Sequence, residues 1–194
     1  TIGVVEGVLG IRWFDCTVTG MEAHAGPTPM GLRKDALLAA TRIMQDVVAA
    51  AHRHPPHGRG TVGMVQVFPN SRNVIPGRVK FSIDLRNSTD ALVDQMAAEV
   101  KAFADQVAQE HGVQVQIDLV SSYPAQQFHA ECVQAVGRAA ARLGYSHMPA
   151  VSGAGHDAVH MAKLAPAGMI FIPCKDGISH NEIEDASPEH ITAG

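Results

Sequence analysis

Cysteine is scarce in this sequence, and the three residues of this type are Cys16, Cys132 and Cys174. Their odd number and their wide, irregular spacing fit neither a disulfide framework nor a zinc knuckle. We therefore expect free thiols in a reducing cytoplasm. Cys174 invites an interpretation as a nucleophile, but its sequence context favours a buried structural thiol.

Long apolar runs and basic clusters are missing as well. No apolar stretch reaches the roughly 20 residues needed to cross a bilayer, and no leader of charged, then apolar, then small residues opens the sequence. Lys and Arg number 15 against 19 Asp and Glu, which gives a net charge of -4. We therefore expect neither a membrane nor a nucleic acid as a partner.

An initiating Met is absent too, and the first residues read as a chain already under way. At the other end, Ser187 and Pro188 are typical of a helix start, yet the sequence ends at Gly194 before two turns are complete. Both features favour a fragment of a longer protein.

What is present first is a regular alternation of strand and helix patterns. The expected elements are strand Ile11 to Val18, helix Leu37 to Ala51, strands Thr61 to Phe68 and Val79 to Arg86, helix Thr89 to His111, and strand Val113 to Leu119. This order, strand, helix, strand, strand, helix, strand, is the split βαβ pattern of the ferredoxin-like kind. It predicts one compact α+β subdomain, in which the long segment from Pro69 to Gly77 forms a shaped loop.

Beyond Pro124 the pattern changes to that of an α/β protein. A helix from Val133 to Leu143 ends at Gly144, and Met169 to Ile172 is a continuous apolar run. Such a run predicts a strand buried on both faces, which needs further parallel strands and covering helices. The remaining residues cannot supply them, so we expect the missing part upstream of Thr1.

Three polar residues in the first region are candidates for chemistry. His24 lies in a turn-rich loop, where a functional role and a solvent-exposed histidine are equally compatible with its position. Asn73 lies in the shaped loop, and Arg86 lies on the polar face of a strand, where its guanidinium can bind a carboxylate through two hydrogen bonds. For Arg86 taken alone, a surface salt bridge with Asp84 is the favoured alternative.

Three more candidates follow in the second region. Gly155 and His156 lie in a small-residue loop whose N–H groups can face an anionic or polar ligand, although a histidine held by a neighbour at a helix start is the favoured alternative for His156. His180 follows the apolar run, and it suits either a metal ligand or a loop histidine bonded to Glu182.

A further group of histidines, His52, His54 and His57, lies beside Arg53 and a Pro-Pro pair. This context indicates an exposed, solvated helix end and no metal site.

Five motifs together resemble the N-carbamoyl-L-amino acid hydrolase family over nearly the whole chain. They are Gly10-Ile11-Arg12-Trp13, Glu22-Ala23-His24-Ala25-Gly26-Pro27-Thr28, Asn73-Val74-Ile75-Pro76-Gly77, Gly155-His156-Asp157 and Ser179-His180-Asn181-Glu182. The same set is similar to that of allantoate amidohydrolases and β-ureidopropionases.

The resemblance implies an α/β metallopeptidase-like catalytic domain with two divalent metal ions, here residues 1–9 and 123–194, and an inserted lid at residues 10–122 that forms a homodimer. By this likeness His180 is the last metal ligand, and the other ligands and a glutamate general base precede Thr1. The metal ions, Zn, Mn, Co or Ni, lower the pKa of a bridging water whose proton the glutamate takes.

The resemblance also implies roles for the candidate residues. The lid presents His24, Asn73 and Arg86 to the active site of the partner subunit. There Arg86 binds the substrate carboxylate, Asn73 holds that end, and His24 stabilises charge on the carbonyl oxygen. Gly155 and His156 hold the ureido end. The products are an amino acid, carbon dioxide and ammonia.

Several alternatives stay open. Among ureido substrates the sequence does not choose between a carbamoyl-α-amino acid, a carbamoyl-β-amino acid and allantoate. An aminoacylase or peptidase with the same metals is a rival reaction. A metal-free dimerisation module is a rival of another class, because a lid alone can pair through its sheet edge.

Overall fold

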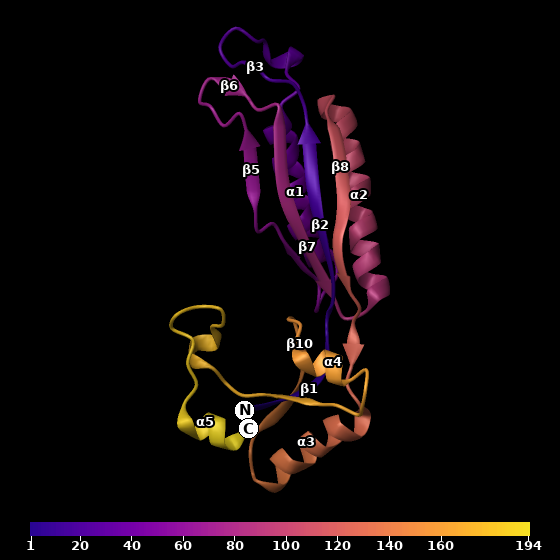
Figure 1. Cartoon of the computed structure of the whole chain (residues 1–194), viewed down its shortest axis with the longest axis vertical. Helices are drawn as coiled ribbons and strands as arrows, with labels where there is room; N and C mark the ends of the chain where they lie inside the picture. The colour runs from indigo at the N-terminus through magenta and orange to yellow at the C-terminus, as the bar shows by residue number, and fades with distance from the viewer. The chain divides into compact units, whose positions relative to one another are not determined.

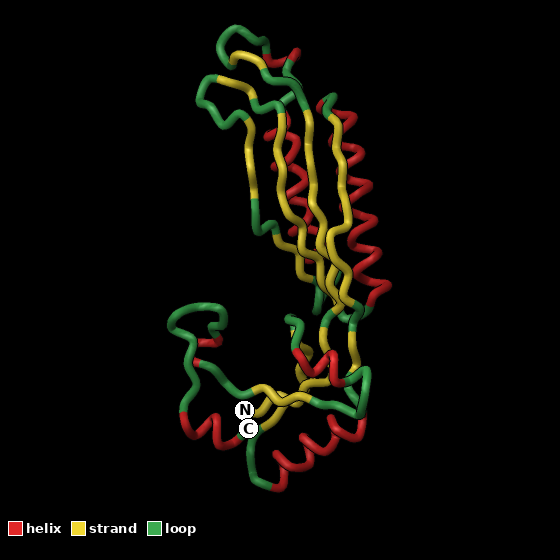
Figure 2. Tube along the Cα trace, viewed as in Figure 1, coloured by secondary structure: helices red, strands yellow, loops and turns green.

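The computed structural model describes residues 1–194 and shows a mixed α/β chain, as predicted. The chain divides into two compact units, one formed by Thr1–Leu9 with Gln126–Gly194 and the other by Gly10–Ala125. Figure 1 shows their elements and Figure 2 their secondary structure. The second boundary lies at Ala125, where the sequence suggested residue 122. No helix is long and apolar enough to span a membrane.

The unit Gly10–Ala125 is an antiparallel sheet with two long helices. Its strands are β2 (Gly10–Thr19), β4 (Arg59–Thr61), β5 (Val65–Phe68), β7 (Arg78–Asn87) and β8 (Gln114–Tyr123), and its helices are α1 (Ala36–Arg53) and α2 (Asp90–His111). The sheet order is β4, β7, β2, β8, and β5 also pairs with β7. The first and third strands of the split βαβ motif are thus central.

Local chemistry explains where the two helices begin and end. Asp35 caps α1 by accepting hydrogen bonds from the backbone N–H groups of Leu37 and Leu38, and Thr89 caps α2 in the same way. Gly112 ends α2 with a φ of 59°, a left-handed conformation that glycine adopts without steric cost.

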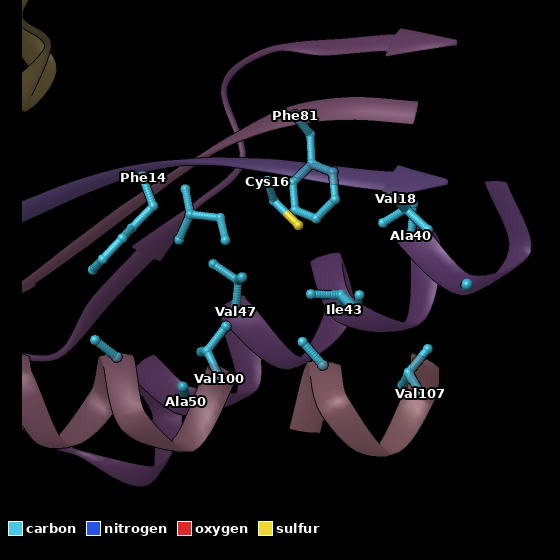
Figure 3. Close-up of a cluster of buried hydrophobic side chains, with 14 of the residues drawn as sticks. Phe14, Cys16, Val18, Ala40, Ile43, Val47, Ala50, Phe81, Val100 and Val107 are labelled. Atoms are coloured by element: carbon cyan, nitrogen blue, oxygen red, sulfur yellow. The ribbon is translucent and has the colours of Figure 1, made fainter. Parts of the chain in front are cut away.

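One apolar cluster joins the sheet to the two helices (Figure 3). Alternate side chains of β2 and β7 point into it, including Phe14, Cys16 and Phe81, and Ile43 and Val47 of α1 fill the space below. The intervening side chains of these strands lie on the opposite face of the sheet. That face carries Arg86.

Two parts of this unit differ from the sequence prediction. The expected strand from Thr61 to Phe68 is two strands, β4 and β5, separated by Val62–Met64. Ser82 accounts for the break, because its backbone N–H donates to the carbonyl of Met64 and its hydroxyl accepts from the N–H of Met64. The shaped loop contains a short strand, β6 (Val74–Ile75), paired with β3 (Ala23–His24).

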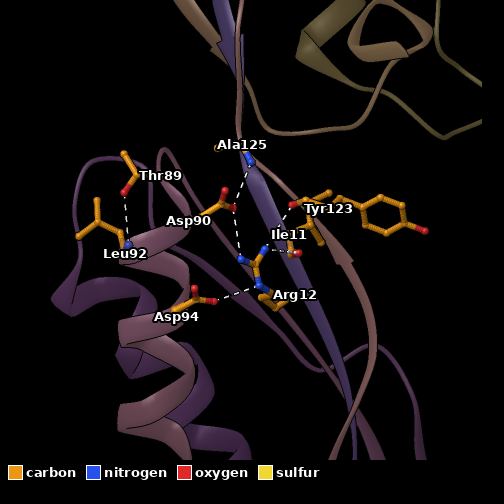
Figure 4. A network of polar contacts seen from close by, with 8 residues as sticks. All are labelled: Ile11, Arg12, Thr89, Asp90, Leu92, Asp94, Tyr123 and Ala125. Atoms are coloured by element: carbon orange, nitrogen blue, oxygen red, sulfur yellow. Dashed lines mark hydrogen bonds and ion pairs between the residues drawn. The ribbon is translucent and has the colours of Figure 1, made fainter. Parts of the chain in front are cut away.

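A network of polar contacts surrounds Arg12, near the start of β2 (Figure 4). The Arg12 guanidinium donates to Asp90 at 3.2 Å and to Asp94 at 3.0 Å, and also to the carbonyls of Ile11 and Tyr123. Asp90 accepts in addition from the N–H of Ala125. The first strand, the last strand and the start of α2 are therefore tied together.

The other unit is built on β1 (Ile2–Val8). β10 (His147–Ser152) pairs with it in parallel, while β9 (Gln126–Gln127) and β11 (Met169–Phe171) pair with it in antiparallel fashion. The helices are α3 (Ala130–Arg142), α4 (Asp157–Met161) and α5 (Pro188–Ala193). Two 3-10 turns, η1 (Met30–Leu32) in the first-described unit and η2 (Lys175–Gly177) here, complete the chain.

The apolar run at Met169 forms the strand β11, and within these residues only one of its faces is covered. Ile170 is 41% exposed, and the strand is antiparallel to β1. The covered side of β11 packs on the small cluster around Val5, Val8 and Phe128.

Candidate functional site

His24 and Asn73 are brought together at one end of the unit Gly10–Ala125. His24 pairs with Val74 in the two-stranded sheet of β3 and β6, and the N–H of Ala25 donates to the Asn73 carbonyl at 2.8 Å. Both side chains are exposed. Backbone pairing thus joins two loops that are far apart in the sequence, one carrying His24 and the other Asn73.

The His24 ring has a defined tautomer. The Gly26 N–H donates to Nδ1 at 3.0 Å, so this nitrogen acts as an acceptor. In the neutral ring the proton therefore lies on Nε2, because a neutral imidazole has one donor and one acceptor nitrogen. Nε2 has no partner in the structure and is a free donor.

Arg86 is paired with Asp84, which is the alternative that its sequence position favoured. Its Nε donates to Oδ1 at 2.9 Å and its Nη2 to Oδ2 at 2.5 Å, and both side chains are half-buried. The hydrogen bond with Asp84 raises the pKa of the Arg86 guanidinium despite the opposing effect of burial. Arg86 is thus a fixed, permanent cation.

A single copy of this unit holds His24 and Asn73 at one end of the sheet and Arg86 at the other. β7 runs from Arg78 to Asn87, so Arg86 lies eight residues from Arg78. At about 3.3 Å per residue this is about 26 Å. The β3 and β6 sheet lies beyond the Arg78 end (Figure 1), and Arg86 pairs with Ile11 at the opposite end. No small ligand can contact both ends.

The His156 side chain is hydrogen-bonded to a neighbour, Ser152, which is the alternative that its sequence position favoured. Its Nε2 lies 2.8 Å from the Ser152 hydroxyl, which donates its one proton to the Ala154 carbonyl, so Nε2–H is the donor to the Ser152 oxygen. The ring also contacts the edge of Phe171, at 5.8 Å between centroids. Gly155 faces open space, since a Cβ added there would meet no atom within 4 Å. The loop from Ser152 to His156 is therefore held by hydrogen bonds, and Gly155 is accessible.

His180 lies in an exposed turn with a φ of 57°. Its backbone N–H donates to a carboxylate oxygen of Glu184 at 3.0 Å, a bond that involves the main chain and not the imidazole. No group of three or more His, Cys, Asp or Glu side chains in the structure could hold a metal ion. The residues of this chain do not make a metal site by themselves.

The prediction that His52, His54 and His57 form a solvated helix end is wrong for His54. Its side chain is only 10% exposed, and its Nε2 lies 2.8 Å from Glu99 on α2. His54 therefore links the two helices, which explains an imidazole at this position without a metal.

Arg33 is a residue that sequence reasoning missed. It donates to the carbonyls of Ala25 and Thr28, in the loop that follows His24. The sequence did contain an indication of this role. A loop with so little regular structure needs hydrogen-bond donors for its carbonyl groups, and Arg33 is the nearest side chain with several donors.

The face of the sheet opposite the helices contains two shallow hollows of about 320 and 280 Å³. Asp15, Met64 and Ser82 line both of them. Trp13 and Asp84 line the smaller one, next to the Arg86 ion pair.

These features define an α/β protein of two units, one of which carries exposed His24 and Asn73 on loops and a half-buried Arg86 on an open sheet face. Solved structures of amidases share this fold. A Burkholderia multivorans amidase of the hydantoinase/carbamoylase family superposes with a TM-score of 0.95 at 52% identity, covering 99% of this chain and 47% of that one.

The chain belongs to peptidase family M20/M25/M40, whose model matches residues 7–194. It is 46% identical over 193 residues to an N-carbamoyl-L-amino-acid amidohydrolase of Rhizobium meliloti, covering 100% of this chain and 46% of the relative. It is 33% identical over 193 residues to the allantoate amidohydrolase of Bacillus subtilis, covering 100% of this chain and 47% of the relative.

The chain thus spans about half the length of the curated relatives that it matches. The predicted resemblance to carbamoyl-amino acid hydrolases and allantoate amidohydrolases is confirmed. Amidohydrolases of this family are generally dinuclear metal enzymes.

Proposed function

We propose that this chain is part of an enzyme that hydrolyses the linear C–N bond of N-carbamoyl-L-amino acids, releasing the amino acid, carbon dioxide and ammonia. The observation that carries the proposal is the 46% identity, over the whole chain, to an amidohydrolase with that substrate in its name. Allantoate is the second candidate, because the allantoate amidohydrolase of Bacillus subtilis also matches the whole chain.

Two of the proposed roles belong to the exposed end formed by β3 and β6. The Nε2–H of His24 donates to the substrate carbonyl oxygen as negative charge develops on it, which lowers the barrier when the donor is already in place. The Asn73 amide binds the same substrate molecule. Support comes from the pairing of the two segments that carry these residues, from the exposure of both side chains, and from the free Nε2 donor.

Arg86 has the role of carboxylate ligand. Its permanent charge and its planar, multiple donors suit that group. Asp84 already accepts from Nε and Nη2, so this carboxylate would orient the guanidinium toward the substrate.

Because one copy of this unit holds His24 and Arg86 at opposite ends, we infer that a single substrate uses His24 and Asn73 of one subunit and Arg86 of the other. The enzyme would then be a homodimer with two composite sites. This differs from an arrangement in which the partner subunit supplies all three side chains.

The remaining roles lie in the unit that contains β1. Gly155, with its open surroundings, and His156 bind the ureido end. His180 contributes one ligand to a site for two divalent ions, Zn, Mn, Co or Ni, whose other ligands lie outside these residues. We also propose a cytoplasmic location, since all three cysteines are free thiols.

The test is ammonia release by the full-length protein after loading with Mn²⁺ or Zn²⁺. The substrates are N-carbamoyl-L-amino acids, N-carbamoyl-β-alanine, allantoate and N-acetyl-amino acids. Preference for an N-carbamoyl-L-amino acid supports the proposal, and preference for allantoate selects the second candidate. Deacetylation or peptide cleavage without turnover of any ureido compound would identify an aminoacylase or peptidase. No metal binding and no turnover would identify a dimerisation module.

A further inference from the structure

The loop that carries His24 has almost no apolar support. No residue of η1 is buried, and Met30 and Leu32 are 74% and 67% exposed. β3 is only two residues long. A segment without buried apolar contacts opens easily, so polar bonds must hold His24 in place.

Those hydrogen bonds link His24 and the loop that follows it to Arg33. Thr28 donates its hydroxyl proton to the His24 carbonyl at 2.7 Å. Arg33 donates from Nε to the Thr28 carbonyl at 3.1 Å, and from Nη2 to the carbonyls of Thr28 at 3.0 Å and Ala25 at 2.7 Å. Between these anchors, Gly26 donates to the imidazole.

We propose that Arg33 is the positioning residue of His24: it fixes the turn at Ala25 and Thr28 so that the Gly26 N–H holds Nδ1 and the Nε2–H is presented to the substrate. The inference rests on the role proposed for His24. Arg33 itself touches no reacting atom. A lysine cannot replace it, because a single ammonium cannot reproduce the fork that spans both carbonyls.

The expected effect on catalysis follows from the geometry of oxyanion stabilisation. A donor helps only if it lies within hydrogen-bonding distance of the developing charge, and a displacement of about 1 Å costs on the order of 100-fold in rate. Loss of Arg33 should therefore lower kcat by about 10- to 100-fold, with little change in KM.

The experiment is a double-mutant cycle in the full-length enzyme, with ammonia release as the readout. Arg33→Gln and His24→Ala should each lower kcat, and the double variant should be no slower than His24→Ala alone. Arg72→Gln is the matched control, since it removes the same charge from an exposed arginine near Asn73. If the kcat losses of Arg33→Gln and His24→Ala instead multiplied in the double variant, the proposal would be overturned.

Gly26→Ala provides a second variant in case Arg33→Gln folds poorly. A Cβ there would lie 3.3 Å from Cε1 and 3.4 Å from Nδ1 of His24, so the ring must shift. Its kcat loss should also vanish in the His24→Ala background. A loss that persists there would count against positioning through this turn.

The position of the His24 ring can be measured without any activity assay, so the inference about Arg33 can be tested independently of the proposed function. In crystal structures of the full-length protein, Arg33→Gln should break the bond between Gly26 and His24 Nδ1, whereas Arg72→Gln should keep it. An unmoved ring in Arg33→Gln would overturn the inference. If His24→Ala retained full activity, the role proposed for His24 would fail instead.

Discussion

At the scale of single residues, Arg86 and Cys16 differ in whether they can take part in chemistry: Arg86 is an oriented cation, and Cys16 is an unreactive thiol. Arg86 and Cys16 belong to neighbouring strands of one sheet, but Arg86 lies on the open face and Cys16 on the face that the helices cover. Position on one face or the other therefore decides which of them can take part in chemistry.

Replacing Arg86 by Ala should raise KM for an N-carbamoyl-L-amino acid by roughly 10- to 100-fold, because a charge-assisted hydrogen-bonded pair with the carboxylate is lost. Steady-state kinetics of the full-length enzyme measures this. Arg86→Lys, which keeps the charge and loses the fork, should fall in between. An unchanged KM for Arg86→Ala would remove the carboxylate role.

Cys16 should resist thiol reagents for as long as the protein is folded. Burial, with a smaller effect from Asp118, raises the pKa of its thiol to about 12, so the reactive thiolate is absent at pH 7 to 9. Alkylation followed by peptide mass spectrometry should label Cys132 and Cys174, which are half-buried, before Cys16. Early labelling of Cys16 would show that this core opens without global unfolding.

At the scale of elements, α1 and α2 are joined by ion pairs in addition to their apolar contacts. Glu99 of α2 accepts from Arg53 at 3.0 Å and lies 2.8 Å from His54, both at the end of α1. Arg42 and Glu110 pair at the other end. Burial alone would raise the pKa of Glu99, but the hydrogen bonds from His54 and Arg53 outweigh it and lower that pKa.

The sign of the pH effect follows from this lowered pKa. The stabilisation by Glu99 is fully present above its usual pKa of 4.5, and it is lost as the pH falls from 4.5 through the lower folded-state value. Glu99→Gln should therefore cost on the order of 0.5–1 kcal/mol at pH 7. Urea denaturation should show that this difference shrinks below pH 4.5.

Elements were predictable where periodicity is strong and local chemistry marks the ends. The caps Asp35 and Thr89 and the terminator Gly112 define α1 and α2, and the alternation in β7 is regular. β10 was missed because His147, Met148 and Pro149 are exposed, so no buried face marks it. The break between β4 and β5 depends on Ser82 of another strand, which local pattern cannot reveal.

The sequence offers candidate site residues one by one but does not give their arrangement. His24 and Asn73 share one end because β3 pairs with β6, and Arg86 lies at the other end because β7 crosses the whole sheet. Sequence motifs carry no strand register, so they could not separate these two ends. Arg33 was missed for a related reason, since its partners are backbone carbonyls that any residue could supply.

At the scale of the whole molecule, the separation within this unit bears on assembly. A single subunit offers either the His24 end or the Arg86 end to a given small substrate. If both ends serve one reaction, two copies must cooperate, and the composite site makes activity depend on dimerisation.

Subunit mixing tests this arrangement. At a substrate concentration well below KM, the His24→Ala and Arg86→Ala homodimers should both have little activity. In a heterodimer of the two, one composite site receives both wild-type side chains and the other receives neither. Mixing equal amounts under subunit exchange should therefore restore about a quarter of wild-type activity, since about half of the dimers are mixed and each has one intact site.

The opposite arrangement predicts the opposite result. If His24 and Arg86 of the same chain served one site, every site of the heterodimer would carry one substitution and no activity would return. His24→Ala mixed with Asn73→Ala is the matched control, because both residues lie at the same end and should not complement each other. Recovery only in the first mixture would place the two ends of this sheet in different subunits of one active site.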